Sequence, residues 1–226
     1  MLMPEEQAGF LRSADNVRQA AERHLRTHRS QQSVVTFVAN LQRGVSRLVG
    51  SAIEQGVEIA CQAGCNHCCS ARVEAMAPEV FLIARELVGR PPDELKHHVE
   101  RLSAHAALNG DTHSPDWRTE CPFLTDGLCS IYEVRPGVCR KAHSLDVTKC
   151  QTHASEIPQD LGTVVGAEAL AKGTSDAYRR LGFDASSHEL GRAVLLVLSD
   201  PSAESRWYSG SAVFVSESHR GLDEGR

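Results

Sequence analysis

Four of the eight cysteines lie within nine residues, in the segment CQAGCNHCC at residues 61–69. The candidate ligands are Cys61, Cys65, Cys68 and Cys69, followed further along the chain by Cys121, Cys129, Cys139 and Cys150. Thiolates are soft ligands that favour zinc, copper(I) or iron in a sulfur cluster. Eight of them equal the ligand count of two four-coordinate sites. The pattern therefore predicts that the eight cysteines bind zinc or iron, with an iron–sulfur cluster as one form of the iron.

The close spacing of the first four cysteines suits a metal site, because a short loop loses little entropy when its ligands are gathered around one ion. The adjacent pair Cys68 and Cys69 is informative, since neighbouring side chains tend to diverge. Either the two thiols serve different metals or one of them is a spare. In both cases the first cluster needs partners from the second, which would pin the later cysteine-rich stretch onto the helices.

Other side chains near the cysteines are candidates for supporting roles. Eight thiolates around two zinc ions would leave an excess of negative charge that a poorly solvated site must neutralise. Arg135 and Arg140 are therefore predicted to assist cofactor binding, and Arg72 and Lys141 also lie near cysteines in the sequence. Two histidines provide alternative fourth ligands, His67 inside the first cluster and His143 shortly after Cys139.

The composition indicates an ordinary water-soluble chain of 226 residues, with 41% hydrophobic residues and a formal net charge of −5. The basic residues are dispersed, so nucleic acid is not an expected partner. No apolar run approaches a membrane span and the N-terminus does not resemble a secretory signal, which predicts no membrane association and a cytoplasmic location. Because the cytoplasm keeps thiols reduced, a metal site is favoured there over a disulfide framework.

Hydrophobic periodicity predicts a mainly α protein: one helical domain, residues 1–226, with an irregular cysteine-rich metal-binding insert. The cysteine core, residues 57–150, is flanked by N-terminal helices within 1–56 and C-terminal helices within 151–200. Periodicity is absent over roughly residues 109–156. The expected helices begin around Phe10, Val34, Pro78, Leu95, Asp160, Asp176 and Ser186.

Two local signals refine these elements. Ser186 and Glu189 are spaced like the two residues of a capping box at a helix start. In the second cysteine region, Asp126-Gly127 is a turn signal, and Pro136-Gly137 is expected to return Cys139 towards Cys129. Ile131 and Tyr132 are predicted to anchor this loop in the core.

The two cysteine segments together resemble the bacterial CxxCxxCC (YkgJ-type) cysteine-cluster family. CQAGCNHCC is followed at a distance by CPFLTDGLCSIYEVRPGVCR, residues 121–140, and the second segment carries most of the specificity. The resemblance covers roughly residues 57–150 and implies chelation of zinc or iron. Some relatives act in protein modification, notably flagellin lysine methylation, so a protein partner or substrate is also implied. The chain departs from the family at Ala77, where Ser or Thr is expected to cap the next helix.

Three alternatives use the same cysteines differently. The metal centre could belong to an enzyme that carries out redox or Lewis-acid chemistry on a protein substrate. The adjacent Cys68 and Cys69 could instead support redox sensing by thiol exchange. Cys61, Cys65 and Cys68 also match the C-x3-C-x2-C triad of radical S-adenosylmethionine enzymes, but the helical pattern that follows does not fit the α/β barrel of that family.

Overall fold

The computed structural model describes residues 3–108 and 118–214, and most of these are helical, which confirms the mainly α class. The α-helices are α1 (Pro4–Thr27), α2 (Gln31–Thr36), α3 (Ala39–Glu54), α4 (Ala77–Val88), α5 (Pro92–Leu108), α6 (Gly137–Lys141), α7 (Val147–Gln151), α8 (Leu161–Arg180), α9 (Leu190–Ser199) and α10 (Ala203–Tyr208). Two 3-10 helices, η1 (His67–Ser70) and η2 (Tyr132–Val134), lie in the cysteine-rich parts.

Four short strands form two separate antiparallel pairs within the described residues. β1 (Glu74–Met76) pairs with β4 (Ser187–Glu189), and the register places Ala75 opposite His188. β2 (Leu124–Thr125) and β3 (Leu128–Cys129) form a tight hairpin. The first pair joins the entry of α4 to the entry of α9, so it connects the cysteine-rich region with the C-terminal helices.

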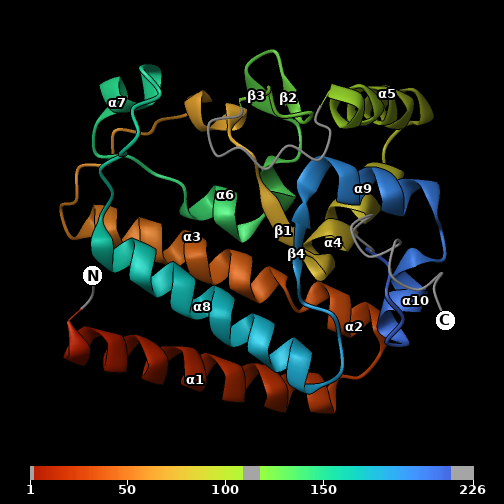
Figure 1. Ribbon diagram of the computed structural model, residues 1–226, viewed down its shortest axis with the longest axis horizontal. Helices are drawn as coiled ribbons and strands as arrows, with labels where there is room; N and C mark the ends of the chain where they lie inside the picture. The colour runs from red at the N-terminus through yellow and green to blue at the C-terminus, as the bar shows by residue number, and fades with distance from the viewer. Residues whose placement is uncertain (1–2, 109–117, 215–226) are drawn as a thin grey trace, which may run out of the picture.

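Helices α1 and α8 run alongside each other, and α3 lies against the other side of α8 (Figure 1). Small residues allow the first pair to pack closely: Ala14 and Ala21 of α1 are each 3% exposed. Opposite them, Gly173 lies so near α1 that a β-carbon placed there would be 2.4 Å from the carbonyl oxygen of Ala14. The helical spacing of small and apolar residues in α1 correctly predicted this buried face.

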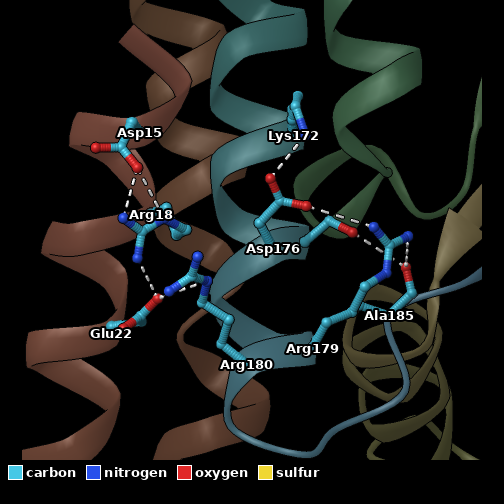
Figure 2. Close-up of polar contacts among 9 residues, drawn as sticks. Asp15, Arg18, Glu22, Lys172, Asp176, Arg179, Arg180 and Ala185 are labelled. Atoms are coloured by element: carbon cyan, nitrogen blue, oxygen red, sulfur yellow. Dashed lines mark hydrogen bonds and ion pairs between the residues drawn. The ribbon is translucent and has the colours of Figure 1, made fainter. Parts of the chain in front are cut away.

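Charged side chains line the surface of the α1 and α8 pair (Figure 2). Arg18 contacts Asp15 and Glu22 on its own helix, each at 2.5 Å, and Arg180 of α8 reaches Glu22 at 3.8 Å. On the adjoining face of α8, Asp176 accepts from Lys172 at 2.7 Å. These partly exposed ion pairs contribute little individually, so the close packing beneath them accounts for most of the association.

Helix α4 is the central apolar element and packs against α9 (Figure 1). On one side Phe81 lies in an aromatic cluster with Trp207, with ring centroids 5.3 Å apart. On another side Ile83 and Leu87 pack with Phe123 and Ile131, which belong to the cysteine-rich loops. The metal-site candidates are therefore supported by the core through α4.

Three expectations about elements differ from the structure. The helical pattern from Val34 onwards is interrupted at residues 37–38, between α2 and α3, whereas the patterns from Asp160 and Asp176 merge into the single helix α8. The capping box of Ser186 and Glu189 is wrong, because residues 187–189 form β4. Glu189 caps α9 itself by accepting from the backbone N–H groups of Gly191 and Arg192, at 3.0 and 2.7 Å.

The stretch predicted to lack periodicity, roughly residues 109–156, is only partly described by the structure. Its residues 109–117 lie outside the described residues, and the rest holds only short elements, from the β2–β3 hairpin to α7. In the described part of the chain, none of the helices combines the length and apolar character needed to cross a membrane.

Candidate metal centre

The two cysteine-rich segments meet through their backbones, although α4 and α5 separate them in sequence. The backbone N–H of Cys121 donates to the carbonyl oxygen of Cys69 at 2.7 Å, and that of Thr119 donates to Ser70 at 3.1 Å. A bridge between Ala71 and Arg118 continues this pairing. The second segment therefore returns to the first cluster, as the cysteine spacing predicted.

The β2–β3 hairpin positions Cys129. Its turn residues Asp126 and Gly127 have φ values of +52° and +76°, which suits the left-handed backbone of a two-residue hairpin turn. The strands pair Leu124 with Cys129, while the N–H of Leu124 donates to the carbonyl of Cys121 at 3.0 Å. The predicted turn is confirmed, and it brings Cys121 and Cys129 into one local unit.

Cys139 joins this unit from α6. Gly137 begins α6 after Pro136, as the predicted change of direction requires. Burial raises the pKa of the Cys139 thiol, and the neighbouring Cys121, Cys68 and Cys129 raise it further. The mutual effects show that the chain does return Cys139 towards Cys129.

We call Cys69, Cys121, Cys129 and Cys139 the inner set. Burial raises the pKa of Cys121 to about 11, and the charge of Cys129 adds to the effect. The charges of Cys121 and Cys129 both raise the pKa of Cys69. Cys121 and Cys129 therefore act electrostatically on both Cys69 and Cys139.

We call Cys61, Cys65, Cys68 and Cys150 the outer set. The pKa of Cys61 is raised by partial burial, and also by Cys65, Cys68 and Cys150. Two contacts hold these residues together: α7, which carries Cys150, packs on η1, and the N–H of Ala60 donates to the carbonyl of Ser144 at 2.8 Å. The late cysteine of the sequence thus lies beside the first cluster.

Cys68 and Cys69 connect the two sets. The side-chain hydrogen bond between them lowers the pKa of Cys68 to about 6 and raises that of Cys69. Arg135 further favours the Cys68 thiolate. The charge of Cys68 also raises the pKa of Cys129 and of Cys139, so Cys68 interacts with the inner set as well.

All eight cysteines are free thiols. Among the described residues, no three His, Cys, Asp or Glu side chains are arranged to hold one metal ion. The chemistry of the donors fits a soft metal, since each set supplies four sulfur atoms. Ligation would require the thiols of a set to turn towards a common point, and the ligand roles of the individual cysteines stay predictions.

Arg135 is a cation that acts on thiols of both sets. Its guanidinium lies 3.7 Å from the centre of the Tyr132 ring, and its charge lowers the pKa of Cys68 and opposes the rise caused by burial at Cys129. Tyr132 was predicted to anchor the loop in the core, and this is wrong, because the residue is 55% exposed. Ile131, 3% exposed, is the anchor. The tyrosine instead provides a surface against which Arg135 stacks.

Arg140 mainly braces the loop. Its Nε donates to the carbonyl of Arg135 at 2.9 Å, a second nitrogen donates to the carbonyl of Glu133, and a third to Ser46 of α3 at 3.2 Å. Its charge also opposes the rise in the pKa of Cys129 that burial causes. The other two cations have acidic partners, since Arg72 pairs with Glu74 and Lys141 with Glu168.

His143 has a structural role in this arrangement. Its Nε2 accepts from the backbone N–H of Asp160 at 2.9 Å, so Nδ1 carries the proton and donates to the carbonyl of Lys141 at 2.8 Å. Both ring nitrogens are therefore used to connect α6 with the start of α8. His67 is the first residue of η1, precedes Cys68 in the sequence and is half-buried.

The sequence analysis did not identify Glu79 as a residue of this region. Its carboxylate is 4% exposed and joins the N-terminus of α4 to that of α6. The available signal was its position in the first helical turn after Pro78, where an acidic residue favours the helix dipole. Ala77 is the first residue of α4 and not its cap, and Glu79 accepts from the N–H of the N-cap residue Met76 at 3.2 Å.

His98 of α5 is only 5% exposed, although it is adjacent to the exposed His97. Arg90 lies 3.0 Å from His98 Nε2 and also donates to the carbonyl of Ser130, next to Cys129, at 2.6 Å. An arginine can only donate, so Nε2 must accept, and the arrangement needs a neutral imidazole. Burial and the charge of Arg90 accordingly lower the pKa of His98.

This arrangement predicts a pH-dependent stability. Because the folded-state pKa of His98 lies below the unfolded value of about 6.5, its stabilising effect is complete above pH 6.5 and is lost as the pH falls. In urea unfolding at several pH values between 7.5 and 5, His98→Gln should reduce the loss of stability on acidification. The exposed His97→Gln is the control and should retain the wild-type pH dependence. Equal pH dependence in wild type and His98→Gln would contradict the assignment.

The fold and the two thiol sets define a mainly α-helical cysteine-cluster protein with donors for soft metals. Residues 60–158 match the family model CxxCxxCC, described as "Putative zinc- or iron-chelating domain". The match confirms the resemblance over this stretch, which includes all eight cysteines. No curated protein and no solved structure matches the chain.

Proposed function

We propose that this protein binds zinc or iron through two four-thiolate sites, one formed by each set. The observation that carries the proposal is the backbone hydrogen bond from Cys121 to Cys69, which ties Cys69 to the inner set, whereas Cys68 acts electrostatically on Cys61 of the outer set as well as on Cys129 and Cys139. The inner set is complete with Cys69 as its fourth thiol. Cys68 then remains to complete the outer set.

The surroundings support metal-bound thiolates electrostatically. Burial raises the pKa of most of these thiols, so a metal must displace their protons, and a nearby positive charge makes this easier. Arg135 supplies that charge at the junction, and Arg140 holds the loop that carries it. We assign both arginines to stabilising the bound metal, not to ligating it.

We further propose that residues 1–226 form a single domain in which the helices support the metal sites. Helix α8 packs on α1 and α3 and also contacts α6, which carries Cys139, while β1 and β4 join distant parts of the chain. The eight free thiols suit a reducing compartment, so we place the protein in the cytoplasm. A protein is the partner that the helical surfaces would bind.

The first test is elemental analysis and an absorption spectrum of protein purified without oxygen. We expect two metal equivalents as zinc, or iron with acid-labile sulfide and a visible absorbance that dithionite bleaches. After a strong chelator has removed the metal, rebinding of the metal should release protons, because the metal deprotonates the thiols. Protein that holds no metal and folds fully without it would contradict the proposal. A reversible Cys68–Cys69 disulfide in such protein would favour thiol exchange instead.

A further inference from the structure

Glu79 is a buried carboxylate that the metal ligation does not use. It lies in the first turn of α4, and its two oxygens accept from different parts of the chain: Oε2 from the N–H of Met76 at 3.2 Å, and Oε1 from the N–H of Gly137 at 2.7 Å. The second bond spans 58 residues and is fully buried. Burial raises the pKa of this carboxyl group, and the two backbone hydrogen bonds oppose that rise.

The bond to Gly137 acts on the N-terminus of α6. The first backbone N–H groups of a helix have no partner within the helix, and Pro136 has no N–H to offer. Glu79 therefore serves α6 as a cap supplied from another element. Because α6 has only five residues, fixing its first residue fixes the direction in which Cys139, two residues later, projects.

We propose that Glu79 is a positioning residue for the inner set, holding the N-terminus of α6 so that Cys139 faces Cys121 and Cys129. The metal-related part of this inference rests on the function proposed above. The positioning of the thiol does not, because it follows from the hydrogen bond between Glu79 and Gly137. The charge of Arg140 opposes the rise in the pKa of Glu79 that burial causes.

The substitution Glu79→Gln tests this role at nearly constant volume. An amide has only one acceptor oxygen, so its NH₂ group must face one of the two N–H donors, and one hydrogen bond is lost. Glu168→Gln is the matched control: it also removes a carboxylate near α6, but that carboxylate is 51% exposed and pairs with Lys141. If Glu79→Gln does not fold, Glu79→Asp keeps the charge and shortens the reach to Gly137, and it enters the same comparison.

The first measurement is the alkylation rate of each cysteine in metal-free, reduced full-length protein, followed by peptide mass spectrometry. In Glu79→Gln we expect Cys139 to react about tenfold faster, since losing a charge-assisted hydrogen bond loosens α6 by that order. Cys61 in the outer set should react at the wild-type rate. Glu168→Gln should change neither rate.

The second measurement is zinc affinity by competition with a chromophoric chelator. We expect Glu79→Gln to weaken one of the two equivalents about 10- to 100-fold, as loss of a ligand-orienting partner typically does, and to leave the other unchanged. A lower melting temperature with unchanged Cys139 reactivity and unchanged zinc affinity would overturn the positioning role. If wild-type protein binds no zinc while Glu79→Gln still accelerates Cys139 alone, the positioning role stands and the proposed metal function fails.

Discussion

Replacing Cys129 with serine should remove one of the two metal equivalents and leave the second bound, whereas replacing Cys61 should remove the other. A serine hydroxyl is a poor ligand for a soft metal at neutral pH, so the altered site loses a thiolate from a set of four. We expect the affinity of the altered site for the metal to fall by more than about a hundredfold. This is a larger effect than the loss of a residue that only hydrogen-bonds to a ligand. The measurement is zinc content after dialysis, followed by competition titration.

The adjacent cysteines provide the sharper comparison within this prediction. Cys68→Ser and Cys69→Ser differ by one position in the chain, yet we expect Cys68→Ser to behave like Cys61→Ser and Cys69→Ser like Cys129→Ser. The matched control is Ser70→Ala. Ser70 is the last residue of η1 and follows the same pair, and its variant should retain both metal equivalents. Loss of both equivalents in every cysteine variant would show one shared site and would reject the division into two sets.

Gly173→Ala should destabilise the protein by about 3 kcal/mol, the upper end of what overpacking a close helix contact usually costs. A β-carbon there would be 2.4 Å from the carbonyl oxygen of Ala14 and 2.6 Å from the β-carbon of Val17. Neither atom can turn away, because one is backbone and the other is fixed to it. Helices α1 and α8 would have to separate. The measurement is urea unfolding of the metal-loaded protein.

Gly50→Ala is the control for helix propensity. Gly50 lies in α3 with no heavy atom within 4 Å of a β-carbon placed there. Replacing it should therefore stabilise the protein by about 0.5–1 kcal/mol, the ordinary gain of alanine over glycine inside a helix. A stable Gly173→Ala variant with an unchanged unfolding midpoint would contradict the tight packing of α1 on α8.

Some chemistry and local structure can be derived from the sequence of this protein alone. Eight cysteines with this spacing indicate soft-metal donors, because ligand type depends on side-chain identity. Helix α4 is marked at both ends by Pro78 and Gly89, and the β2–β3 turn by Asp126-Gly127, since these signals act within a few residues. Periodicity likewise predicted the buried face of α1. It did not identify α10, whose six residues are too few to show a period.

The partners of these local elements were decided by the tertiary structure. Residues 187–189 became a strand because β1 was available as a partner, and this outweighed a local capping signal. Tyr132, which was expected in the core, is exposed, because burial depends on which element lies opposite. A sequence pattern describes one face of one element and carries no information about what covers it.

The division of the thiols shows the same limit at the site itself. The sequence determined that eight sulfur atoms are present, and the adjacency of Cys68 and Cys69 led us to expect that they do not serve one metal together. Only the fold placed Cys150 beside Cys61 and Cys139 beside Cys129, through contacts between segments far apart in the chain. The bond from Glu79 to Gly137 joins residues 58 positions apart, and no local signal encodes it. Donor chemistry is a property of residues, but grouping donors into sites requires the tertiary contacts that bring distant residues together.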